Sequence, residues 1–114
     1  MSAIDYAKLY PVKKFKIAHD GDPVQQAIVA AVTGKKIVVL SYVLTIGGTT
    51  DGTVTWQSAD TALSGAMSLQ SDGAAIIAVD HSPRGCLETV AAEALNITTS
   101  GIAVAGHGTY VEAG

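Results

Sequence analysis

The sequence predicts an all-β protein, an antiparallel β-sandwich of jelly-roll-like type with about eight strands. Turn signals built from Gly, Pro, Asp and Ser recur at intervals of about 8–12 residues, a spacing typical of sandwiches and barrels. Several segments between these turns alternate apolar and polar residues, as half-buried strands do. No long segment repeats apolar residues at the helical period. Residues 27–33 look helix-like, but their β-branched side chains disfavour a helix.

Three strands are expected in the first half of the chain, at residues 12–19, 26–33 and 35–46. Gly21-Asp22-Pro23 predicts a turn between the first two, because Gly permits positive φ and Pro fixes φ at about −65°. Gly34 separates the second strand from the third. The third is the strongest, because residues 37–46 are almost all β-branched, aromatic or Leu. Such a continuous apolar run predicts a strand that is covered on both faces.

Further strands are expected at residues 53–58, 66–70, 74–79, 86–89, 95–99 and 102–112. Turn signals at 47–48, 51–52, 71–73, 81–85 and 100–101 separate them. In the strand at 53–58, Val54 and Trp56 share one face, which predicts core positions. Residues 91–94 fit either a helical turn or a wide loop. Gly106 and Gly108 in the last strand indicate a bulge or a close backbone approach.

The composition argues against several classes of protein. Hydrophobic residues make up 48% of the chain and charged residues 15%, which is too apolar for a disordered protein. No apolar stretch approaches the ~18 residues that a membrane span needs, and the N-terminus lacks a signal-peptide pattern. The single Cys86 excludes an internal disulfide and fits folding in a reducing cytoplasm. The net charge of −3 argues against a nucleic-acid binder, which is usually basic.

The charges are unevenly distributed along the chain. Residues 1–36 hold six lysines and three aspartates, whereas residues 37–114 hold one arginine and seven acids. This asymmetry suggests two surfaces with different neighbours. A soluble monomer usually carries more surface charge, and the mean hydropathy is +0.34. Together these features predict an oligomer or an assembly subunit.

Three histidines and one acidic turn are the candidate metal ligands. His19, His81 and His107 lie outside every HxH, HExxH or CxxC arrangement, so they bind a metal only if the fold brings them together. The stretch from His19 to Asp22 is similar to the start of a calcium loop, but it lacks the later ligands and the closing Glu. A turn is the simpler interpretation. We therefore expect no metal and no cofactor.

The sequence offers little support for an enzyme. Ser82 or Cys86 could pair with His81, but neighbours in one loop rarely supply the orienting acid and oxyanion hole of nucleophilic catalysis. The chain has no GxSxG elbow, and no acid pair lies in a setting typical of glycoside hydrolysis. Trp56 and the four tyrosines could line a carbohydrate patch, although Trp56 on an alternating strand is more simply a core residue. A small hydrolase is thus the least supported class.

Lys13, Lys14 and Lys16 form a basic cluster around Phe15. Single-stranded nucleic acid would need several stacking aromatic residues beside such a cluster, and one Phe is too few. An edge strand protected by lysines and an arm that docks on an acidic protein surface are the two remaining interpretations. Asn96-Ile97-Thr98 matches the N-glycosylation triplet, but without a secretory signal we interpret the match as chance.

Four stretches resemble small structural proteins of tailed bacteriophages and prophages. They are AIVAAVTGKKIVVLSYVLTI, GTVTWQS, TALSGAMSLQSDG and ETVAAEALNITTSGIAVAGHGTYVE, and the similarity spans residues 24–112. The shared features are a Gly-Lys-Lys turn that enters a long strand, a Trp strand and a Leu-Asn-Ile-Thr strand. The resemblance implies a virion component that is not an enzyme, similar to the jelly-roll head decoration, or cement, proteins.

Decoration proteins of this kind typically form trimers over the threefold positions of the capsid and clamp neighbouring capsomers. The resemblance therefore implies a homotrimer whose partner is the major capsid protein. It implies a location on the virion surface after synthesis in the bacterial host cytoplasm, with no nucleic-acid and no membrane partner. A tail, neck or fibre module that binds host surface carbohydrate is the alternative.

Residues 1–23 fall largely outside the resemblance. For them we predict an N-terminal arm or first strand, in front of a sandwich domain at 24–114. A short apolar arm without a partner in the sandwich becomes ordered only when something ties it down. Its aromatic residues are of the type enriched at binding hot spots. We predict that the arm docks on the capsid or on a neighbouring subunit through Tyr6, Lys8, Leu9, Tyr10, Lys13, Lys14, Phe15 and Lys16.

Overall fold

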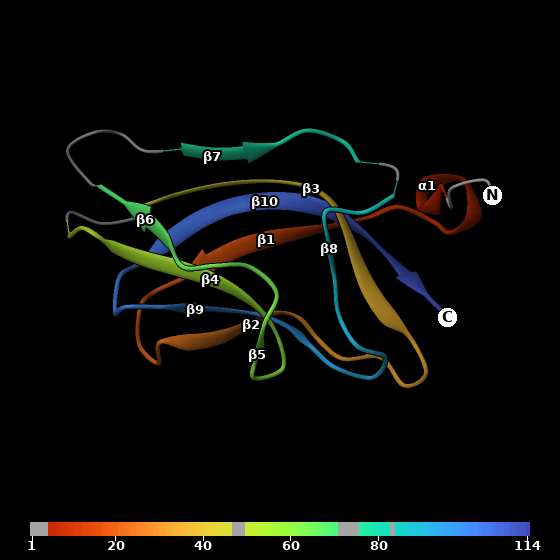
Figure 1. Cartoon of the computed structure of the whole chain (residues 1–114), viewed down its shortest axis with the longest axis horizontal. Helices are drawn as coiled ribbons and strands as arrows, with labels where there is room; N and C mark the ends of the chain where they lie inside the picture. The colour runs from red at the N-terminus through yellow and green to blue at the C-terminus, as the bar shows by residue number, and fades with distance from the viewer. Residues whose placement is uncertain (1–4, 47–49, 71–75, 83) are drawn as a thin grey trace.

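Two antiparallel β-sheets pack face to face around one apolar layer (Figure 1). The computed structural model describes residues 5–46, 50–70, 76–82 and 84–114. Sheet I consists of β1 (Lys13–His19), β3 (Lys36–Ile46), β7 (Ile76–Val79), β8 (Leu87–Glu88) and β10 (Val104–Ala113). Sheet II consists of β2 (Gln25–Val29), β4 (Gly52–Ser58), β5 (Thr61–Ala62), β6 (Met67–Leu69) and β9 (Leu95–Thr99).

The strand pairing follows the path of a long hairpin that is rolled up on itself. β1 pairs with β10, β2 with β9, β3 with β7 and β8, and β4 with β5 and β6. β10 also pairs with β3, and β9 also pairs with β4. These contacts join the strand pairs into the two sheets. If the two short strands on each outer edge count as one position, the chain fills the eight positions of a jelly roll. The predicted fold class is therefore confirmed.

The described residues form ten strands where the sequence suggested about eight. The difference arises at the two edges, where β5 with β6 and β7 with β8 are separate short strands. β5 was not predicted, because two residues are too few to show an alternation. Residues 26–33 form a strand only at β2, and the helix-like alternative for 27–33 is wrong. The predicted turns at 47–48 and 71–73, and Pro83 in the turn at 81–85, lie outside the described residues.

Trp56 lies at the centre of the core and is fully buried. Its ring meets Tyr42 edge-on at 4.9 Å between centroids, and it meets Phe15 at 6.1 Å with an interplanar angle of 77°. Edge-to-face contacts of this kind are favourable beyond the area that they bury. The prediction that Val54 and Trp56 share the core face of one strand is confirmed.

A β-bulge in β3 explains why its apolar run is continuous. Tyr110 pairs with Val39 and Thr109 pairs with Ser41, so Leu40 is an extra residue with no partner on β10. The alternation therefore shifts by one residue, and Val39 and Tyr42 both face the core. Val38 and Leu40 point to the other side of sheet I and are also fully buried. The prediction of a strand covered on both faces is confirmed for this part of β3.

The cover on the outer side of sheet I is a one-turn helix, α1 (Tyr6–Leu9), which the sequence analysis did not predict. Tyr6 is 7% exposed and packs in a cluster with Val38, Leu40, Val111 and Ala113. Figure 1 shows α1 at one end of sheet I, beside β10 and β3. The rest of the outer side of sheet I is free of this helix.

Candidate interaction surface

The eight predicted docking residues lie in different environments, some buried and some exposed. The side chains of Tyr6 and Phe15 are buried within the chain's own two apolar clusters, so they are not available to a partner in this state. Tyr10 is half-buried and stacks on Tyr6, with 6.3 Å between the ring centroids. The remaining five are exposed: Lys8, Leu9, Lys13, Lys14 and Lys16.

The expectation of an arm without a partner in the sandwich is wrong for residues 5–10. The outer side of sheet I offers an apolar platform, made of Val38, Leu40, Val111 and Ala113, and Tyr6 fills it. The ammonium group of Lys36 also lies 5.7 Å from the centre of the Tyr6 ring, within the range of a cation–π contact. The sequence could not reveal this platform, because the bulge at Leu40 decides which residues of β3 face outward.

Alternation along β1 decides which lysines are available. Phe15, Ile17 and His19 face the core, so Lys14 and Lys16 stand on the outer side of sheet I. Lys13, at the start of the strand, donates a hydrogen bond to Glu112 Oε1 at 2.9 Å. This hydrogen bond is the main cause that raises the pKa of Lys13 above its ordinary value. No ion pair within the described part of the chain involves Lys14 or Lys16.

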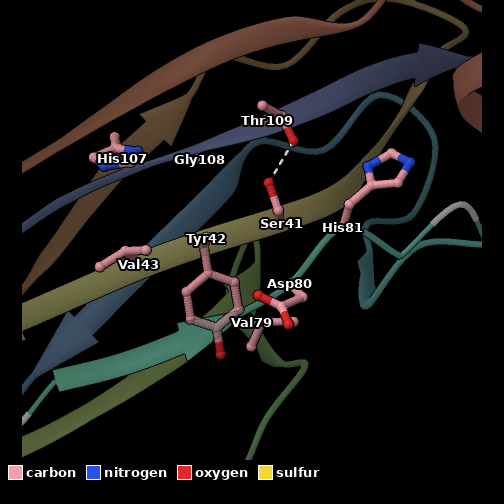
Figure 2. Close-up of a pocket in the computed structure, with 9 residues that line it drawn as sticks. All are labelled: Ser41, Tyr42, Val43, Val79, Asp80, His81, His107, Gly108 and Thr109. Carbon is pink, nitrogen blue, oxygen red and sulfur yellow. Dashed lines mark hydrogen bonds between the residues drawn. The ribbon is translucent and has the colours of Figure 1, made fainter.

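The outer side of sheet I is hollowed next to these two lysines. One shallow hollow of about 530 Å³ is lined by Lys14, Phe15, Lys16, His107, Gly108 and Thr109. A second hollow of about 300 Å³ lies across β10, β3 and the end of β7 (Figure 2). At its centre the hydroxyl groups of Ser41 and Thr109 are hydrogen-bonded at 2.6 Å. The sequence does not reveal these hollows, because their walls come from strands that are distant in the sequence.

The three histidines do not come together. His19 is 2% exposed and lies in the core between the sheets, whereas His107 and His81 are exposed. Figure 2 shows His107 and His81 at opposite ends of the second hollow. Within the described ranges, no group of three His, Cys, Asp or Glu side chains could hold a metal ion.

His19 is instead a structural residue of the β1–β2 corner. The Gly21 N–H donates to His19 Nδ1 at 3.0 Å, so the ring proton lies on Nε2, which donates to the Val24 carbonyl at 2.9 Å. Asp20 accepts hydrogen bonds from the Gln26 amide and from the backbone of Asp22, and these bonds lower the pKa of its carboxyl. The prediction of a turn at 21–23 is thus confirmed, and the Asp20 carboxylate is engaged within it.

The nucleophile–base pairs considered from the sequence are not formed. Ser82 Oγ donates to the Asp80 carbonyl at 3.2 Å, and Cys86 Sγ donates to the Val39 carbonyl at 3.3 Å. Neither side chain has a hydrogen bond with His81 in this structure. Burial raises the pKa of the Cys86 thiol, which disfavours the reactive thiolate.

The carbohydrate patch considered around Trp56 is not present. The indole is fully buried beneath Phe15 and Tyr42, and no sugar ring could stack on it. Burial is the main cause that raises the pKa of the Tyr42 hydroxyl, and the neighbouring Trp56 side chain opposes the rise.

The outward face of sheet II carries no charged side chain on β2, β9 and β4. We call this the polar face; its residues are Gln25, Ala27, Thr53, Thr55, Gln57, Asn96 and Thr98. Thr55 lies directly opposite Thr98, and Gln57 lies opposite Asn96. The sequence does not reveal this face, because it forms only when β2, β9 and β4 lie side by side.

Side-chain amides link the strands at one end of the polar face. Gln25 Nε2 contacts Gln57 Oε1 at 2.8 Å and Asp60 Oδ1 at 3.0 Å. Asn96 Nδ2 donates to the Ala59 carbonyl at 3.0 Å, so the amide of the possible glycosylation triplet is engaged in the fold. Asn96 Oδ1 is buried and has no hydrogen-bond partner in the part of the chain that the structure describes.

Comparison with known proteins adds no relative. Neither a family model nor a curated protein sequence matches the chain. Among the described residues, no helix has the length and apolar character to cross a membrane.

Proposed function

We propose that the protein is a phage head decoration, or cement, protein that binds the outer capsid surface as a trimer and stabilises the head. The observation that carries the proposal is the separation of charge between the two outward faces. Lys14 and Lys16 stand on sheet I without an ion pair to any described residue, whereas the residues of the polar face on sheet II carry no charge. A subunit that binds two different neighbours needs two faces of different chemistry.

The polar face serves for contact between copies. The chain has a net charge of −3, so copies repel one another weakly, and an uncharged contact surface adds no local repulsion to this. Burying Thr, Gln and Asn side chains costs little free energy when they find hydrogen-bond partners, whereas burying unpaired charges costs much more. Three copies that meet in this way also explain why so few residues of the chain are charged.

The lysine-bearing side of sheet I faces the capsid. Three copies joined in a trimer present three such surfaces, and several weak contacts made at once bind far more tightly than one. The jelly roll supplies a rigid body, and the platform on sheet I holds α1 as part of that body. The four stretches that resemble phage structural proteins support a virion partner, and the proposal takes the capsid as that partner.

The direct test is decoration of heads. Heads assembled from the major capsid protein of the genome that encodes this chain are mixed with the purified protein, pelleted, and imaged by electron cryomicroscopy. We expect co-pelleting and new density at the threefold positions, with a higher temperature for head disruption. A chain encoded among tail genes, with binding to purified tails or host glycans and none to heads, would refute the proposal.

A further inference from the structure

The two hollows on the outer side of sheet I form one continuous trough. Both are lined by His107, Gly108 and Thr109 of β10, so they meet along that strand. The trough runs from Lys14 and Lys16 on β1, across β10 and β3, to the end of β7. Figure 2 shows the part of it between His107 and His81. It lies on the same side of the sheet as α1, but away from the platform that Tyr6 fills.

The two ends of the trough have opposite charge. At the β1 end, the exposed Lys14 and Lys16 have no ion pair in the described ranges, whereas Lys13 is paired with Glu112. At the β7 end, the exposed Asp80 lines the wall beside His81. Between the ends, Ser41 and Thr109 present hydroxyl groups and Val43 presents an apolar surface.

The size of the trough suits a short extended peptide. Neighbouring strands lie about 4.8 Å apart, so three spacings from β1 to β7 span about 14 Å. An extended chain advances about 3.4 Å per residue, so about four residues cross this distance. The outer side of sheet I already holds one short segment, because α1 packs on it through Tyr6.

We propose that this trough binds an extended segment of a partner protein, with acidic residues over Lys14 and Lys16 and neutral residues toward Asp80. The inference rests on the proposed function, in which the partner is the capsid protein. The opposite charges at the two ends decide the chemistry of the occupant. A nucleic acid carries phosphates along its whole length and would place one against Asp80, and two lysines are few for such a ligand.

The test uses a peptide probe and the intact protein. The probe is the capped hexapeptide Gly-Asp-Thr-Asp-Thr-Gly, and its control is Gly-Asn-Thr-Asn-Thr-Gly. Binding is followed by nuclear magnetic resonance on ¹⁵N-labelled protein at low and at physiological salt. We expect millimolar aspartate peptide to shift the backbone amide resonances of Lys14, Lys16, His107 and Thr109. We expect added salt to weaken the binding of this peptide.

Two variants test whether Lys14 and Lys16 contribute to peptide binding. We expect the double variant K14S/K16S to bind the aspartate peptide about tenfold more weakly, the size expected when two exposed charge contacts are lost. The control K35S removes a lysine outside the trough and should bind as wild type. Equal binding of the two peptides, wild-type binding by K14S/K16S, or no shifts at millimolar peptide would each overturn the inference.

Further outcomes separate this inference from the proposed function. If K14S/K16S decorates heads as fully as wild type, the trough is not the docking site while the decoration function stands. If the peptide binds as expected but wild type does not decorate heads, the trough stands and the decoration function fails. Stronger binding of an oligothymidine probe than of the peptide would assign the trough to nucleic acid. Dissociation of the K14S/K16S variant into monomers would show that the trough binds a second copy of this chain.

Discussion

Phe15 and Gly108 stand directly opposite each other in the β1–β10 ladder, and the Phe15 ring occupies the space that a side chain at residue 108 would need. A Cβ atom at Gly108 would collide with the Phe15 ring and with the Ser41 carbonyl oxygen. The absence of a side chain at Gly108 therefore lets Phe15 reach Trp56, and the core and the close approach of β10 to β3 depend on the same glycine. The predicted close backbone approach at this glycine is confirmed.

The first prediction follows from this contact. We expect Gly108→Ala to lower the free energy of unfolding by about 3 kcal/mol, because the new methyl group must displace both a core ring and backbone. Gly65→Ala is the matched control, since a Cβ at Gly65 meets nothing within 4 Å. Urea unfolding followed by Trp56 fluorescence measures both. Equal stability of the two variants would contradict the packing described here.

The second prediction concerns His19. Replacing it with Ala leaves a cavity and leaves the Gly21 N–H without its acceptor, while the Val24 carbonyl keeps only the Thr99 N–H, so we expect a loss of about 3 kcal/mol. His19→Asn keeps an acceptor near the position of Nδ1 and should lose less. His107→Ala, at an exposed position, should change stability by no more than about 0.5 kcal/mol. Chemical denaturation ranks the three variants, and a His19→Ala protein as stable as His107→Ala would be evidence against a structural role of His19 in the β1–β2 corner.

The sequence predicts the strands well where the local pattern carries the information. In β4 and β9, inward residues such as Trp56 and Ile97 alternate with outward residues such as Thr55 and Thr98, and the structure keeps that alternation. The part of the β3 run around Val38 and Leu40 is also read correctly as covered on both sides, whereas Ser41 and Val43 line the trough. The pattern does not reveal which segment of the chain covers the outer side of β3.

The missed features depend on contacts between residues that are distant in the sequence. α1 is a single turn, too short for a helical period, and it is held by the platform that the bulge at Leu40 creates. Lys13 and Lys14 look alike in the sequence, yet only Lys13 meets Glu112, 99 residues away. The trough and the polar face likewise arise only from the order of strands within each sheet.

The third prediction concerns the platform on sheet I. Tyr6→Ala removes the ring that covers Val38 and Leu40, so we expect the free energy of unfolding to fall by about 3 kcal/mol. Leu9→Ser, at a side chain that is 64% exposed, serves as the control and should change stability by no more than about 0.5 kcal/mol. Thermal unfolding measures both variants. A Tyr6→Ala protein with wild-type stability would show that α1 is not part of the folded body.

The fourth prediction is a loss of stability at alkaline pH. Burial raises the pKa of Cys86 and of Tyr42 above their ordinary values of 9.0 and 10.0, so the folded state keeps protons that the unfolded state releases. Their contribution is therefore complete below about pH 9 and is lost as the pH rises through the folded pKa values. Urea midpoints from pH 8 to 11 should fall, and Tyr42→Phe should fall less steeply. A parallel decline of both proteins would rule out Tyr42 as a cause.

The fifth prediction tests the assignment of the polar face to contacts between copies. Thr55 lies on β4, the second strand from the edge of sheet II, opposite Thr98. A lysine at this position can extend into water in a monomer, but between two copies its charge would be buried without a partner. We therefore expect wild type to sediment at three times the chain mass of 11.6 kDa and Thr55→Lys to sediment as a monomer with an unchanged far-ultraviolet circular dichroism spectrum.

The matched control is Ala105→Lys, which places the same charge on an exposed position of β10 in the other sheet. Ala105 lies between Ala18 and Thr45 in sheet I, and its side chain is exposed on the outer side. A long side chain there therefore leaves the core and the polar face of sheet II unchanged. We expect this variant to remain a trimer, because its new charge lies on the side that faces the capsid. If Ala105→Lys dissociates while Thr55→Lys stays trimeric, copies meet through sheet I, and the two faces must exchange their proposed roles.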